Sequence, residues 1–173
     1  MITYIDIASR YIDVCVAISR SLRNTQHMRV LFVASEMTPL AKVGGLGDVI
    51  GALPQSLRRT GVNVTVVIPR YEHIKKNTLT RIRVLQKNVT LYRTKVGTVP
   101  VFLIDAPPLN RGSVYFEKTA FAGKEAERDR FVFFSEQVFE LIRTNILRPD
   151  IVHCHDWHTG VLVRALKRKF EIR

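Results

Sequence analysis

The sequence predicts a doubly wound α/β fold with a Rossmann-like, mostly parallel sheet, on three observations. The run RVLFVA at 29–34 is rich in apolar and β-branched residues, as in a strand that is covered on both faces. Glycines follow, and apolar residues then recur at helical spacing over 46–57. The run NVTVVI at 63–68 supplies a second strand, so the three segments form a right-handed β-α-β unit.

The rest of the chain continues the alternation of strands and helices. In chain order we expect strands at 81–94 and 98–104, a long helix from near Glu125 to before Pro149, a strand at 151–154 and an amphipathic helix over 161–170. Pro54 is expected to kink or divide the first helix, because its nitrogen cannot donate a helical hydrogen bond.

Residues 1–27 differ in pattern from the chain that follows them. Their serines and arginines weakly resemble an organelle transit peptide, but Asp6 and Asp13 argue against one. We therefore expect 1–27 to be an N-terminal extension of unknown role that lies outside the fold. Residues 28–173 are expected to form the folded domain.

The composition is that of a globular protein with a real core. Of 173 residues, 46% are hydrophobic and 24% are charged, which excludes a disordered or collagen-like chain. The apolar runs are far shorter than the roughly 20 residues of a membrane-spanning helix, so no membrane partner is expected. The two cysteines lie far apart in sequence, so we expect a reducing compartment and no disulfide framework.

A net charge of +12 raises the possibility of a nucleic-acid binder. The excess is concentrated in 58–95, where ten Lys and Arg residues stand against Glu72 alone. Most of these cations alternate with apolar residues of expected strands, and no zinc-knuckle, aromatic RNA-binding or basic heptad pattern accompanies them. A solvated basic face is favoured over a specific nucleic-acid site, while a polyanionic ligand or a nucleotide stays open.

The first candidate site follows the strand at 29–34. Ligands of open parallel sheets bind beyond the carboxyl ends of the strands. There, Gly44, Gly45 and the start of the next helix could present backbone N–H groups to an anion, with Lys42 adding a full charge. The segment has neither the dinucleotide-binding nor the P-loop pattern. A tight strand-to-helix turn with an incidental surface lysine explains the spacing equally well.

The second candidate site is the run HCHDWH at 153–158, at the end of another strand. Histidine and aspartate side chains could bind zinc or iron, but the spacing fits no common zinc pattern. Hydrogen bonding to a sugar or a phosphate is favoured over a metal. Asp156 as a helix cap and Trp157 as a packing residue are the simpler alternatives. Cys154 is expected to be buried and unreactive, because adjacent strand residues point to opposite faces.

Five segments resemble bacterial glycogen synthases and plant starch synthases, in the same order along the chain. They are RVLFVASEMTPLAKVGGLGDVIGALP at 29–54, VIPRYEHI at 67–74, FLIDAP at 102–107, ERDRFVFFS at 127–135 and RPDIVHCHDWHTG at 148–160. The resemblance covers nearly everything except the extension. It implies the GT-B architecture of two Rossmann-like halves facing a cleft, with 28–173 as a partial N-terminal catalytic domain.

The resemblance also implies an activity and a set of site residues. The reaction would transfer glucose from ADP-glucose to the non-reducing end of an α-1,4-glucan with retention, without a metal or other cofactor. Its catalytic residues would be Asp156, His155 and Asp48, and its substrate-binding residues would be Lys42, Gly44, Gly45, His158 and Glu36. Negative charge develops on the departing nucleotide diphosphate, where a lysine and oriented N–H groups can stabilise it.

The resemblance covers only the first half of such an enzyme. We therefore expect the isolated chain to be inactive and to require a C-terminal GT-B half or self-association. A non-catalytic glucan-binding or interaction domain derived from the family is the alternative. The expected location is the cytoplasm for a bacterial protein, which is favoured, or the plastid stroma for a plant protein. The choice between starch and glycogen as product stays open.

Overall fold

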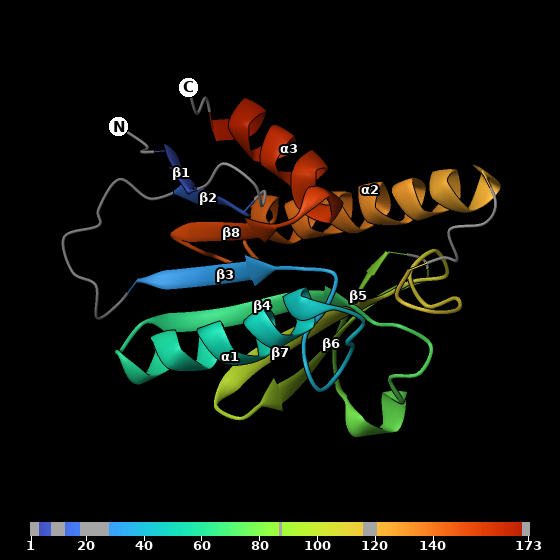
Figure 1. Ribbon diagram of the computed structural model, residues 1–173, viewed down its shortest axis with the longest axis horizontal. Coiled ribbons are helices and arrows are strands. Elements are labelled where there is room, and N and C mark those ends of the chain that lie inside the picture. The colour runs from blue at the N-terminus through green and yellow to red at the C-terminus, as the bar shows by residue number, and fades with distance from the viewer. Residues whose placement is uncertain (1–3, 8–12, 18–27, 87, 116–120, 171–173) are drawn as a thin grey trace.

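The computed structural model describes residues 4–7, 13–17, 28–86, 88–115 and 121–170. Its strands and helices are β1 (Tyr4–Ile7), β2 (Asp13–Ala17), β3 (Arg29–Val33), α1 (Gly45–Arg59), β4 (Asn63–Pro69), β5 (Thr80–Gln86), β6 (Val89–Val96), β7 (Val99–Asp105), α2 (Phe121–Arg143), β8 (Ile151–His155) and α3 (Gly160–Phe170), with short 3-10 turns η2 (Lys76–Thr78) and η3 (Trp157–Thr159) (Figure 1). No helix in these ranges is long and apolar enough to cross a membrane.

The strands form one mixed sheet in the order β1-β2-β8-β3-β4-β7-β6-β5. The four central strands, β8, β3, β4 and β7, are parallel, and the strands on either side pair antiparallel. Short turns join β5 to β6 and β6 to β7, whereas the connection from β3 to β4 contains α1 and that from β7 to β8 contains α2 (Figure 1).

Two hydrophobic cores cover opposite faces of this sheet. Alternate residues of a strand point to opposite faces. Accordingly, Leu31 and Val33 join one core with residues of α2 and α3, whereas Phe32 joins the other core with Ile50 of α1. The arrangement confirms the doubly wound, mostly parallel α/β fold.

Helix α1 is continuous through Pro54, although proline was expected to kink or divide it. Pro54 and Ile50 are buried on the face that α1 turns to the sheet. A proline inside a helix costs about 3 kcal/mol. Packing of this buried face offsets that cost, so the helix begins at Gly45 and ends only at Arg59.

The segment expected as one strand at 81–94 is two strands of a hairpin. Asn88 divides β5 from β6 with a φ of 66°, a left-handed conformation that asparagine tolerates better than most residues. Gly97 makes the next turn, with a φ of 56°, between β6 and β7. Because the first of these turns has Asn88 in place of a glycine, the sequence analysis did not predict it.

Residues 1–27 were expected to lie outside the fold, and this was wrong for two parts of the segment. Strand β2 pairs antiparallel with the outer edge of β8, with Val14 opposite Cys154, and β1 pairs with β2. An unpaired strand edge leaves backbone N–H and C=O groups without partners, and β2 supplies them along β8. Such pairing between ends of the chain leaves little trace in local periodicity.

Candidate active site

The candidate site lies where β3 and β8 end. These strands are parallel neighbours, with Val33 opposite Cys154. The loops that follow them therefore emerge side by side at the carboxyl edge of the sheet, as expected for the two motifs (Figure 1). A hollow of about 470 Å³ opens there, lined by Glu36, Val43, Gly44, Gly45, Leu46, Tyr115, Glu127, Asp156, Trp157 and His158. Five of the predicted site residues thus share one hollow.

Glu36 holds the glycine turn in place. It is only 2% exposed, and its Oε2 accepts hydrogen bonds from the backbone N–H groups of Val43 at 2.7 Å and Gly44 at 2.9 Å. A Cβ at Gly47 would lie 3.1 Å from the same oxygen, so a side chain there would crowd the carboxylate. The Gly44 N–H, which was expected to face an anion, is therefore directed to Glu36.

Tyr115 joins the two halves of the hollow. Its hydroxyl donates to Glu36 Oε1 at 2.5 Å and lies 2.9 Å from Ser35 Oγ, while its ring stacks on His158 with 5.1 Å between centroids. Burial, and then the hydrogen bond to Glu36, raise the pKa of this phenol above its usual value. The sequence analysis assigned no role to Tyr115, because only tertiary contacts reveal one.

Arg130 fixes the loop that carries Tyr115. It is 2% exposed and donates through Nη1 to the carbonyl oxygens of Ser113 at 2.8 Å and Val114 at 3.1 Å. It also donates through Nε to the Pro108 carbonyl and through Nη2 to the Arg111 carbonyl. One side chain of α2 thus binds four carbonyls of a loop without regular structure. The ERDRFVFFS segment was noted in the sequence, but not this residue.

His158 forms the inner wall of the hollow. It is 6% exposed, its Nδ1 lies 3.4 Å from Ser35 Oγ, and its ring packs edge-on against Phe131 with 4.4 Å between centroids. Burial lowers the pKa of His158 to about 4, because desolvation disfavours the imidazolium. The ring is therefore neutral at pH 7.

This shift predicts a pH dependence of stability that belongs to His158. Between its unfolded pKa of 6.5 and its folded pKa of about 4, the unfolded chain binds a proton that the folded chain does not. The contribution of His158 to the free energy of unfolding is therefore full above pH 6.5 and is lost as pH falls toward 4, by up to about 3 kcal/mol.

Urea unfolding at several pH values should show this loss. His158→Gln should flatten the profile in that window, whereas His73→Gln, at an exposed histidine, should not. Parallel profiles for His158→Gln and the unaltered protein would contradict the assignment.

His155 lies beneath the hollow and does not line it. The side chain is fully buried, with its ring stacked on Phe32 at 5.3 Å and 4.2 Å from that of His153. The two histidines share one face of β8, because alternate residues of a strand point to the same side. Among the described residues, no group of three His, Cys, Asp or Glu side chains is placed to hold a metal ion. Cys154 is buried, as expected.

Asp156 turns the chain from β8 into η3. It adopts a φ of 59°, unusual for a residue with a side chain, and its carboxylate makes no capping hydrogen bond to the turn. Such conformations cost of order 1–3 kcal/mol and cluster at functional sites. The next residue, Trp157, packs edge-on against Phe131 yet is 50% exposed at the rim. It is thus only in part the packing residue that was expected.

Lys42 and Asp48 lie outside the lining of the hollow and pair with each other. The Lys42 ammonium is 2.7 Å from Asp48 Oδ1, and both side chains are about half exposed. The hydrogen bond from Lys42 lowers the pKa of Asp48, with a smaller effect from Thr38. The structure therefore places these two predicted residues together, beside the glycine turn.

Comparison with known proteins identifies the family. Residues 29–172 match the family described as starch synthase catalytic domain. This chain belongs to that family. A glycogen synthase of Alkaliphilus metalliredigens is 35% identical over 155 residues, which cover 83% of this chain and 31% of that protein. A glycogen synthase of Geotalea daltonii is 38% identical over 154 residues, with 82% and 31% covered.

A solved structure shows the family's fold as well. The catalytic domain of starch synthase IV from Arabidopsis thaliana, bound to ADP and acarbose, superposes with a TM-score of 0.66 at 29% identity. The match covers 79% of this chain and 29% of that one. The resemblance to glycogen and starch synthases, and the GT-B-type fold that it implied, are confirmed. The chain spans about a third of the length of its relatives.

Proposed function

We propose that this chain is the N-terminal part of a glucosyltransferase that uses ADP-glucose to extend an α-1,4-glucan at its non-reducing end, with retention of configuration. The observation that supports this is the joining of the glycine turn to the HCHDWH segment around one hollow, through Glu36, Tyr115 and His158. The Arabidopsis relative binds ADP and acarbose, a nucleotide and an oligosaccharide analogue, in keeping with both substrates.

In this proposal the walls of the hollow have different roles. The glycine turn at Gly44 and Gly45, with Lys42 beside it, faces the donor's diphosphate. Because the Gly44 N–H stays bonded to Glu36, it is the Lys42 ammonium that stabilises the negative charge as the diphosphate departs. Asp156 and His158 line the sugar side. His158 is neutral and can hydrogen-bond a hydroxyl group without adding charge. His155 acts from beneath, by supporting this wall, and Asp48 orients Lys42 through their ion pair.

Glu36 is a positioning residue within the same proposal. It would act through the backbone of Val43 and Gly44, to which it is hydrogen-bonded, and through Tyr115. Residues 28–173 are then a partial N-terminal catalytic domain, and a second GT-B half or a further copy of the chain completes the cleft. The role of residues 1–27 beyond the pairing of β1 and β2 is not assigned.

The 173-residue chain alone is expected not to synthesise glucan. Holding donor and acceptor together supplies several kcal/mol of the barrier, and one wall of a GT-B cleft cannot do this. We expect ADP-glucose to bind in the millimolar range, near −4 kcal/mol. Incubation with ADP-glucose and a maltooligosaccharide primer, followed by measurement of ADP release, tests this. Robust release that Lys42→Ala abolishes would show that this half suffices.

A glucan-binding domain without catalysis is the second candidate, favoured by the exposure of Trp157. An aromatic ring that is half exposed at the rim of the hollow offers a platform for a sugar ring. Titration of the chain with maltoheptaose can be followed by the fluorescence of Trp157, the protein's single tryptophan. Both candidates predict that this glucan binds, and they differ in whether ADP-glucose is bound and used. Binding of the glucan by a complete enzyme that neither binds nor hydrolyses ADP-glucose would favour this second function.

A further inference from the structure

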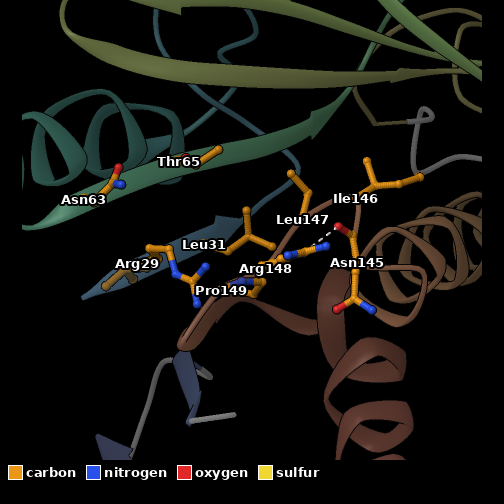
Figure 2. Close-up of a pocket in the computed structure, with 10 residues that line it drawn as sticks. Arg29, Leu31, Asn63, Thr65, Asn145, Ile146, Leu147, Arg148 and Pro149 are labelled. Atoms are coloured by element: carbon orange, nitrogen blue, oxygen red, sulfur yellow. Dashed lines mark hydrogen bonds between the residues drawn. The ribbon is translucent and has the colours of Figure 1, made fainter. Parts of the chain in front are cut away.

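A second cavity lies at the opposite edge of the sheet, where β3 and β4 begin. Its volume is about 290 Å³, and its lining is Arg29, Val30, Leu31, Asn63, Thr65, Asn145, Ile146, Leu147, Arg148 and Pro149. Figure 2 shows the Arg29 and Arg148 side chains beside Leu31, with Asn63 and Thr65 on the neighbouring strand β4. The candidate active site lies at the carboxyl ends of the strands, so the two cavities are separate.

Two guanidinium groups give this cavity a positive rim. Arg29 donates to Asp150 through Nε at 3.1 Å and Nη2 at 2.8 Å, which leaves Nη1 without a hydrogen-bond partner among the described residues. Arg148 donates only through Nε, to the backbone oxygen of Asn145 at 3.2 Å. This bond orients the guanidinium. Its two terminal nitrogens have no hydrogen-bond partner among the described residues and can bind a ligand. No acidic side chain lines the cavity.

The remaining lining is suited to a small hydroxylated molecule. Thr65 and Asn63 place a hydroxyl and an amide at the cavity, and the Asn63 Oδ1 also accepts a long hydrogen bond from Arg58 at 3.4 Å. Asn145 lines the cavity through its backbone, and its amide is directed away from Arg148 (Figure 2). Leu31 and Leu147 are nearly fully buried and form an apolar floor. A largely preformed cavity with an apolar floor and a few convergent polar groups is the usual form of a small-molecule site.

We propose that this cavity binds a sugar phosphate, with its phosphate group on the terminal nitrogens of Arg148 and on Arg29 Nη1, and its hydroxyl groups on Asn63 and Thr65. Guanidinium groups form paired, charge-assisted hydrogen bonds with phosphate oxygens. The cavity volume is that of a single phosphorylated sugar ring and not of a dinucleotide or a long glucan. The site is independent of the proposed transferase function, because none of its residues lines the first hollow.

Isothermal titration calorimetry on the whole chain tests this, with glucose 6-phosphate, inorganic phosphate and glucose as probes at one ionic strength. We expect glucose 6-phosphate to bind more tightly than phosphate, and glucose not to bind measurably. Arg148→Gln should weaken binding of the sugar phosphate about tenfold or more, because it removes a charged hydrogen-bond donor. Arg81→Gln, which removes the same charge from an exposed site in β5, should leave the affinity unchanged.

Asn145→Asp is the sharper variant. It keeps the shape of the side chain and suits the φ of 58°, but it adds a negative charge beside the cavity, on the residue whose backbone oxygen binds Arg148. We expect it to abolish binding of both anions while the melting temperature stays close to that of the unaltered chain. The proposal would be overturned if both Asn145→Asp and Arg148→Gln bound glucose 6-phosphate with the affinity of the unaltered chain. It would also be overturned if the unaltered chain did not bind glucose 6-phosphate at millimolar concentrations. Equal affinities for phosphate and the sugar phosphate would overturn the role of the hydroxyl contacts.

Discussion

Replacing Arg130 with methionine is expected to destabilise the protein by about 4 kcal/mol. The change keeps most of the apolar stem, but it removes the donors that bind the carbonyls of Pro108, Arg111, Ser113 and Val114. Each buried carbonyl that loses its partner costs about 1–3 kcal/mol, reduced where water can enter. Urea unfolding at pH 7 measures the change in the free energy of unfolding.

The matched control is Arg128→Met, on the same helix. Arg128 is exposed and pairs with the adjacent Asp129, so its loss should leave the free energy of unfolding nearly unchanged. Arg130→Lys should fall between the two, because it keeps the charge and loses the fork of donors. If Arg130→Met unfolds with the same midpoint as Arg128→Met, the loop that carries Tyr115 is held by other contacts.

Lys42→Ala is expected to lower the rate of glucosyl transfer roughly 100-fold or more in a complete enzyme that carries this domain. Under the proposed function, the ammonium stabilises the diphosphate as it leaves, and alanine removes that stabilisation from the transition state. Folding should be nearly unaffected, because Lys42 is about half exposed and an exposed ion pair with Asp48 contributes little. Steady-state kinetics with ADP-glucose, alongside thermal melting, provides both measurements.

Lys75→Ala is the control for this prediction, because Lys75 is also exposed and lies outside the lining of the hollow. Its removal changes the net charge equally and should leave kcat unchanged. Asp48→Asn should lower kcat less than Lys42→Ala does, because the lysine stays in place without its ion-pair partner. Turnover near normal in Lys42→Ala would remove Lys42 from the donor-binding residues and leave the backbone of the glycine turn as the donor-binding element.

The sequence by itself determined the central part of the fold. Buried parallel strands are continuous apolar runs, and their helices carry an apolar stripe, so β3, α1, β4, α2, β8 and α3 all have local patterns that predict them. Their order predicted the doubly wound sheet. Because ligands bind beyond the carboxyl ends of parallel strands, the same reasoning placed the two site segments after β3 and β8.

The edges of the sheet were decided by tertiary structure. Strand β2 pairs with β8 across more than a hundred residues of sequence, and β1 pairs with β2. Asn88 separates β5 from β6 without a glycine. Likewise, Pro54 stays inside α1 because a buried face outweighs a local penalty. Each of these depends on what lies across from a residue in space, and a periodicity along the chain does not contain that information.

The candidate site divides in the same way. The sequence determined which residue types gather at the carboxyl edge, since their positions after two strands place Glu36, Gly44, Asp156 and His158 around one hollow. Only the tertiary structure decided their roles. It turned Glu36 toward the glycine turn, buried His155 beneath the wall, and brought in Tyr115 from a loop held by Arg130. The reason is physical: strand order fixes where a backbone segment ends, whereas burial and hydrogen-bond partners come from elements distant in sequence.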